Sequence, residues 1–107
     1  MKQRKLIVPI YNVKLIICIV DSHEEGQKIE PDFNEYEFGL CQAGRGVFRI
    51  ILLSNASISY IAHECEHAKN SILSYIGQKA DYDSDEIDAY LLQYIVEQVE
   101  KLIKNKN

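Results

Sequence analysis

The residues best suited to chemistry in this chain are two histidines four positions apart, with a glutamate directly after the first. His63 and His67 are expected to project from one face of a helix, one turn apart. Two imidazoles placed in this way can both reach one metal ion at about 2.0–2.1 Å, and zinc is the metal typical of this pattern. Glu64 lies beside them, where its carboxylate can take a proton from a metal-activated water. The motif therefore predicts a Zn²⁺ site with a general base next to it.

A zinc site that performs hydrolysis needs a third protein ligand and one position left for water. The chain has an acidic cluster downstream of the motif, and we expect the third ligand to come from it. Glu86 is the favoured ligand, because Ile87 and Tyr90 suggest that this helix start faces the core. Asp85 and Asp88 remain alternatives.

Other interpretations of these residues stay open. Asp83 and Glu86 match a capping box, in which the glutamate only reaches back to the N–H of the cap residue. His23 stands alone at the end of a strand and is expected to be solvated. Cys65 lies inside the motif but faces the other side of the helix, so it is a poor ligand.

The composition is typical of a globular protein, and the length of 107 residues fits a single domain, 1–107. The net charge of −4 argues against a nucleic-acid partner, and no apolar run approaches the length of a membrane span. The basic N-terminus is followed by an apolar stretch that polar residues interrupt, so we expect no secretory signal. Three widely spaced cysteines without a Cys-x-x-Cys pair suit a reducing compartment, and we expect a cytoplasmic protein.

Apolar segments in the first half of the chain are typical of strands. We expect strands at residues 5–10, 13–21, 37–42 and 47–53. Tyr11-Asn12 favours a hairpin between the first two, because Asn tolerates the left-handed conformation of tight turns. The second run is apolar throughout, which predicts a central strand covered on both faces. The polar segment 22–36 is predicted to be a loop that can include a short helical turn.

Two long helices are predicted in the second half of the chain. Apolar residues recur at helical spacing from 56 to 77, and Gly77 is suited to end that helix. Asp83 or Ser84 can cap a last helix. We expect its buried face to consist of Ile87, Tyr90, Leu91, Tyr94, Ile95, Val99 and Leu102. The sequence thus predicts an α+β fold, a small antiparallel or mixed sheet followed by two long helices.

The segment His63-Glu64-Cys65-Glu66-His67, followed by Asp85-Glu86-Ile87-Asp88-Ala89-Tyr90, resembles the gluzincin group of zinc metallopeptidases. In length the chain is most similar to the minigluzincins and to small predicted metallopeptidases of phage and prophage origin. The resemblance implies a zincin-like fold, with His63, His67 and Glu86 as zinc ligands and Glu64 as general base. It also implies hydrolysis of peptide bonds, with an edge strand before the motif helix bordering the cleft, a place that 47–53 occupies.

The resemblance is incomplete where gluzincins often carry an aspartate that supports a ligand histidine, because Tyr90 stands there. The partner expected from the resemblance is a peptide or protein substrate, with neither nucleic acid nor membrane involved, and the oligomeric state is not predicted. The alternative function is a non-catalytic, zinc-containing protein-interaction module of phage origin.

Overall fold

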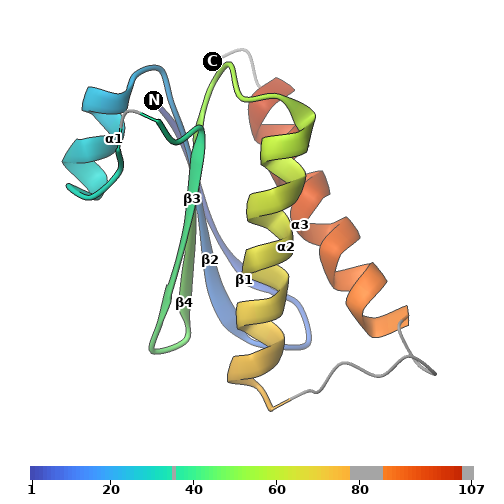
Figure 1. Ribbon diagram of the computed structural model, residues 1–107. Helices are drawn as coiled ribbons and strands as arrows, with labels where there is room; N and C mark the ends of the chain where they lie inside the picture. The colour runs from blue at the N-terminus through green and yellow to red at the C-terminus, as the bar shows by residue number, and fades with distance from the viewer. Residues whose placement is uncertain (35, 78–85, 105–107) are drawn as a thin grey trace.

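The computed structural model of the chain describes residues 1–34, 36–77 and 86–104. The fold is α+β, a mixed four-stranded sheet followed by long helices, which confirms the predicted class (Figure 1). The elements in chain order are β1 (Lys2–Val8), β2 (Val13–Val20), α1 (His23–Ile29), β3 (Gly39–Gly44), β4 (Val47–Leu53), α2 (Ile58–Tyr75) and α3 (Glu86–Lys104).

The sheet has the strand order β1-β2-β4-β3, and its two central strands run parallel to each other. The predicted hairpin is confirmed, since β1 pairs antiparallel with β2. The prediction that β2 is a central strand covered on both faces is also confirmed. Its side chains point alternately to two cores, one on each face of the sheet. Leu15 and Ile17 belong to the core under the helices, whereas Ile16 and Cys18 belong to the core on the opposite face.

The strand 47–53 is not at the edge of the sheet, so that expectation was wrong. It forms β4 over the predicted residues, but β4 lies between β2 and β3 and is hydrogen-bonded on both sides. The reason is its composition, since most of its side chains are buried on one face of the sheet or the other. The edge strand is β3, whose glycines and polar residues fit a strand with one side unpaired.

Helices α2 and α3 cover one face of the sheet and run antiparallel to each other (Figure 1). The core between them and the sheet includes Ala68 and Ile72 of α2 and Ile95 of α3, each 0% exposed. Helix α2 stops at the predicted place, where Gly77 adopts a positive φ of 81°. The buried face predicted for α3 was partly wrong, because Ile87 and Tyr90 are 41% and 67% exposed.

One end of the opposite face of the sheet is covered by α1 and by Phe33, which follows it (Figure 1). The short helical turn predicted in 22–36 is a seven-residue helix, α1, capped by the side chain of Ser22, which accepts from the N–H of Glu25 at 3.1 Å. Phe33 is 0% exposed and fills the second core together with Ile16, Cys18, Val20, Ile51 and Leu53. In the described ranges, the structure contains no helix of the length and apolarity that crossing a bilayer requires.

Candidate metal centre

His63 and His67 face solvent on the side of α2 that is turned away from the core, one helical turn apart. Their Nε2 atoms lie 3.1 Å apart. Two ligands of a tetrahedral zinc ion, each at about 2.0–2.1 Å, are separated by roughly 3.3 Å. The spacing of the two imidazole nitrogens therefore fits two ligands of one zinc ion, and the expected pairing of these histidines is present in the structure.

Glu64 lies next to the histidines but points inward, and its side chain is only 8% exposed. Burial raises the pKa of the Glu64 carboxyl; His63 and His67 act to lower this pKa, and the carboxylate of Glu37 acts to raise it. Among the described residues no group donates a hydrogen bond to this carboxylate. A carboxylate with raised proton affinity beside two imidazoles is suited to accept a proton.

The edge strand β3 passes directly alongside Glu64, and Gly39 provides the space for this approach. A Cβ atom at Gly39 would lie 2.8 Å from Cγ of Glu64 and 2.8 Å from Cδ2 of Leu52. Any larger residue would displace one of these side chains. The position of the proposed base is therefore determined by close packing between α2 and the edge of the sheet.

Two hollows lie between β3 and α2, one on each side of the histidine pair. The first has a volume of about 340 Å³ and is lined by Gly39 of β3 and by His63 and Glu64 of α2. The second has a volume of about 440 Å³ and is bordered by Ala43 of β3 and His67 of α2. Open space therefore lies on both sides of the histidines along the edge strand. A binding site for an extended peptide requires such space.

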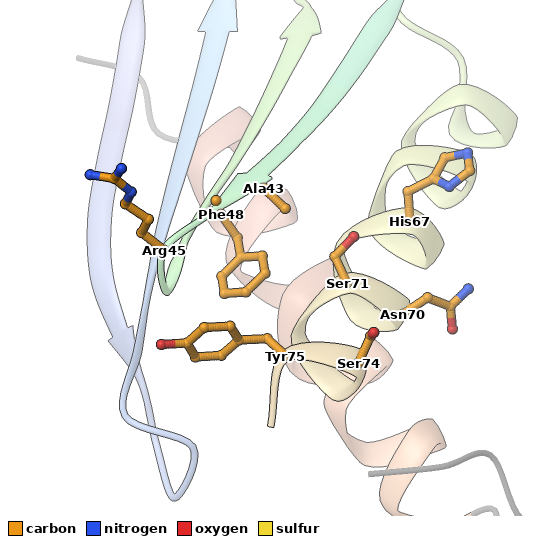
Figure 2. A pocket seen from close by; sticks show the side chains of 9 residues that line it. Ala43, Arg45, Phe48, His67, Asn70, Ser71, Ser74 and Tyr75 are labelled. Carbon is orange, nitrogen blue, oxygen red and sulfur yellow. The ribbon is translucent and has the colours of Figure 1, made fainter. Parts of the chain in front are cut away.

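Figure 2 shows the second hollow, between the end of the β3–β4 hairpin and the second half of α2. The rings of Phe48 and Tyr75, which both line it, meet edge to face with centroids 5.8 Å apart. Ser71 and Ser74 project from α2 into the same region (Figure 2). This hollow therefore combines aromatic rings with hydroxyl groups that can form hydrogen bonds.

Glu86 lies in the first turn of α3, where it is exposed. Its neighbour Asp88 forms an ion pair with Lys69 of α2 at 3.7 Å, and Lys69 also contacts Glu66 at 2.7 Å. Within 1–34, 36–77 and 86–104, no three His, Cys, Asp or Glu side chains converge closely enough to hold a metal ion. The structure thus brings His63 close to His67 but does not bring Glu86 into a group with them.

None of the other residues considered as ligands is seen beside the histidine pair in the described part of the chain. Asp83 and Asp85 lie outside the described residues, and with them the capping-box interpretation of Glu86. Cys65 is 0% exposed, which confirms that it faces away from the histidine side, and burial raises its thiol pKa to about 12. His23 is not simply solvated, because its Nε2 lies 2.7 Å from the carbonyl oxygen of Glu37 and its ring stacks on Phe33.

Three residues near the site were not found from the sequence. Gly39, Glu37 and Tyr60 all line the hollow beside His63 and Glu64. Gly39 is the first residue of β3, and Glu37 lies two residues before it. Both are near the histidines only because β3 is the strand next to α2. The apolar pattern gives no strand order, so no sequence signal marked Gly39 and Glu37. Tyr60 lies three residues before His63 on the same helix, and this spacing could have marked it.

Comparison with known proteins gave no match, since no family model, no curated protein and no solved structure is similar to the chain.

Proposed function

We propose that this chain is a small zinc-dependent hydrolase that cleaves peptide bonds, of the gluzincin type that its motif resembles. The observation that carries the proposal is the 3.1 Å separation of the Nε2 atoms of His63 and His67, together with the inward-pointing carboxylate of Glu64 in the next position. This combination gives two metal ligands and a general base on one helix.

In the proposed reaction, Zn²⁺ supplies Lewis acidity, which lowers the pKa of water and polarises a carbonyl group. His63 and His67 hold the ion through their Nε2 atoms. Glu64 accepts a proton from the attacking water and later delivers it to the leaving amine. The raised pKa of Glu64, caused mainly by burial, supports this role because a carboxylate with raised proton affinity is a better proton acceptor.

The edge strand β3 is the element that we propose to align the substrate. One side of β3 is hydrogen-bonded to β4, and β3 is the last strand of the sheet on that side. An extended peptide can pair with such an edge through main-chain hydrogen bonds. The two hollows beside the histidines would then receive side chains of the bound peptide.

Glu86 is the third ligand that we propose. Its place in the first turn of α3 means that this turn must come closer to the histidines when zinc binds. Metal binding can be coupled to a local change of structure, because the free energy of binding a zinc ion is then available to reorder the chain around it. The proposal therefore couples metal binding to a local change at the start of α3.

The test of the metal site is the zinc content of the purified protein, measured by elemental mass spectrometry. We expect about one zinc ion per chain, and loss of it in His63→Ala and in Glu86→Ala. Glu97→Ala is the matched control, because Glu97 is an exposed glutamate on the same helix as Glu86. Zinc that is retained in Glu86→Ala would remove Glu86 from the ligand set.

The test of the hydrolytic role is cleavage of a mixed peptide library by the zinc-loaded protein, followed by mass spectrometry. Glu64→Gln preserves the size of the side chain but cannot accept the proton, so we expect cleavage to be lost while the zinc content stays the same. Equal cleavage by the wild-type protein and by this variant would exclude Glu64 as the general base.

A second candidate function is a non-catalytic, zinc-containing module that binds a partner protein. The observation that favours it is the ion pair between Asp88 and Lys69, which holds the first turn of α3 beside α2 without including Glu86 in a metal site. This function predicts bound zinc, no cleavage of any peptide, and no effect of Glu64→Gln on partner binding. For either function we propose a cytoplasmic location, which the three free thiols support.

A further inference from the structure

The hollow beside His63 and Glu64 has an aromatic wall that the proposed chemistry does not explain. Phe38 and Tyr60 stack on each other with ring centroids 4.7 Å apart, which holds Tyr60 against the segment before β3. Tyr36 lines the same hollow and is 82% exposed. A volume of about 340 Å³ is enough for one long side chain and part of the backbone that carries it.

Glu37 adds a negative charge to this aromatic wall. Its main chain is fixed at both ends, since its N–H donates to the carbonyl of Asn34 at 3.0 Å and its own carbonyl oxygen lies 2.7 Å from Nε2 of His23. Its side chain is half-buried, yet among the described residues no cation and no hydrogen-bond donor pairs with its carboxylate. A partly desolvated carboxylate without a partner attracts a cation.

The other residues that line the hollow leave this charge uncompensated. Neither lysine nor arginine is among them, and the second carboxylate, Glu64, has the same sign. A lysine or arginine side chain would therefore meet a carboxylate and two tyrosine side chains, and both kinds of group can attract cations. An acidic side chain would be repelled, and an aliphatic one would leave Glu37 unpaired.

We propose that this hollow is a specificity subsite for a basic side chain, lysine or arginine, of the peptide substrate. Glu37 supplies the ion pair, and Tyr36 and Tyr60 supply the aromatic contacts. The identity of the ligand as a substrate peptide rests on the proposed hydrolytic function. The preference of the hollow for a positively charged side chain follows from its lining residues alone and does not depend on hydrolysis.

The test measures binding separately from cleavage. The dissociation constant of acetyl-Ala-Lys-Ala-amide is measured by chemical-shift titration of the ¹⁵N-labelled protein with its metal in place, and mass spectrometry verifies that the peptide is uncut. The reference peptide carries norleucine, which has a similar length but no charge, in place of lysine. We expect the lysine peptide to bind about three- to tenfold more tightly, with the largest shifts at Gly39 and Ser59, which line the hollow.

Two variants identify the source of the preference. Glu37→Gln should make the two peptides bind with about equal affinity, and Tyr36→Leu should reduce the preference in part. Glu97→Gln removes one negative charge from the exposed surface of α3 and should keep the full preference. Equal affinity for the two peptides in the wild-type protein, or a lysine preference that survives Glu37→Gln, would overturn the proposal.

Cleavage then separates this inference from the proposed function. If the zinc-loaded protein cleaves peptides, bonds next to lysine or arginine should be overrepresented among its products, and Glu37→Gln should remove that bias. If it cleaves nothing but still prefers the lysine peptide, the hydrolytic function fails and the cation subsite stands as part of a peptide-binding module. Cleavage with no bias toward basic residues would refute the subsite and leave the hydrolase intact.

Discussion

Replacement of Gly39 by alanine tests whether close packing at the edge strand positions Glu64. The new methyl group would lie 2.8 Å from Cγ of Glu64 and 2.8 Å from Cδ2 of Leu52, and 3.3 Å from the carbonyl oxygen of Ile51. Leu52 is 0% exposed and cannot move without disturbing the core. Glu64 must therefore move, or β3 must separate from α2.

The expected magnitude follows from the cost of adding a methyl group to a packed interior, which is about 1–3 kcal/mol. For a domain of this size that corresponds to a fall in Tm of roughly 5–15 °C. Thermal unfolding followed by circular dichroism measures this fall. Gly44→Ala is the matched control in the same strand, since no atom lies within 4 Å of its added Cβ, and its Tm should stay nearly unchanged.

The same substitution should also weaken the proposed chemistry, because a displaced Glu64 no longer lies beside the histidines. We expect Gly39→Ala to lower the rate of peptide cleavage while His63 and His67 continue to bind zinc. Equal unfolding temperatures for the Gly39 and Gly44 variants would show that the close approach of β3 to Glu64 does not exist, and the argument for a rigidly placed base would fail with it.

Two further predictions concern the packing on either side of the sheet. Phe33→Ala should destabilise the protein by about 3–5 kcal/mol in urea unfolding, because this fully buried ring fills the core under α1, whereas Tyr36→Ala, at a residue that is 82% exposed, should change stability little. Burial raises the thiol pKa of Cys41 to about 11 from an ordinary 9.0, so its alkylation by iodoacetamide at mildly alkaline pH should be about a hundredfold slower than that of a free thiol. Unfolding in urea should restore the rate, and fast alkylation in the folded protein would contradict the burial of Cys41 between β3 and α2.

Local patterns in the sequence were sufficient to predict most of the elements. The apolar run of β2 is buried on both faces as expected, and the strand 47–53 has the predicted bounds. The motif helix begins and ends within two residues of the predicted positions, and Gly77 has the left-handed backbone that its place suggested. These features depend on neighbouring residues, and for that reason a single sequence reveals them.

The order of the strands was not predicted, because it depends on contacts between distant segments. Strands β2 and β4 are adjacent and parallel although α1 and β3 come between them in the chain. Hydrophobic periodicity records which face of a strand is buried but not which strand lies beside it. The expectation that 47–53 is the edge strand came from the resemblance to gluzincins, and hydrophobic periodicity could not correct it. Glu37 and Gly39 were missed because the pattern does not show that β3 lies beside α2.

The sequence predicts Glu86 as the third zinc ligand, whereas the structure does not place it in a group with His63 and His67. The buried stripe of α3 contains Leu91, Ile95 and Val99, and at about 100° per residue Glu86 lies roughly 140° around the helix from Leu91. The packing that fixes α3 against the sheet therefore turns Glu86 away from the core. Among the described residues no three side chains of metal-ligating type converge, so a Glu86–zinc bond requires the first turn of α3 to move relative to α2. The effect of Glu86→Ala on zinc content thus decides whether the start of α3 rearranges around a metal or only begins a helix.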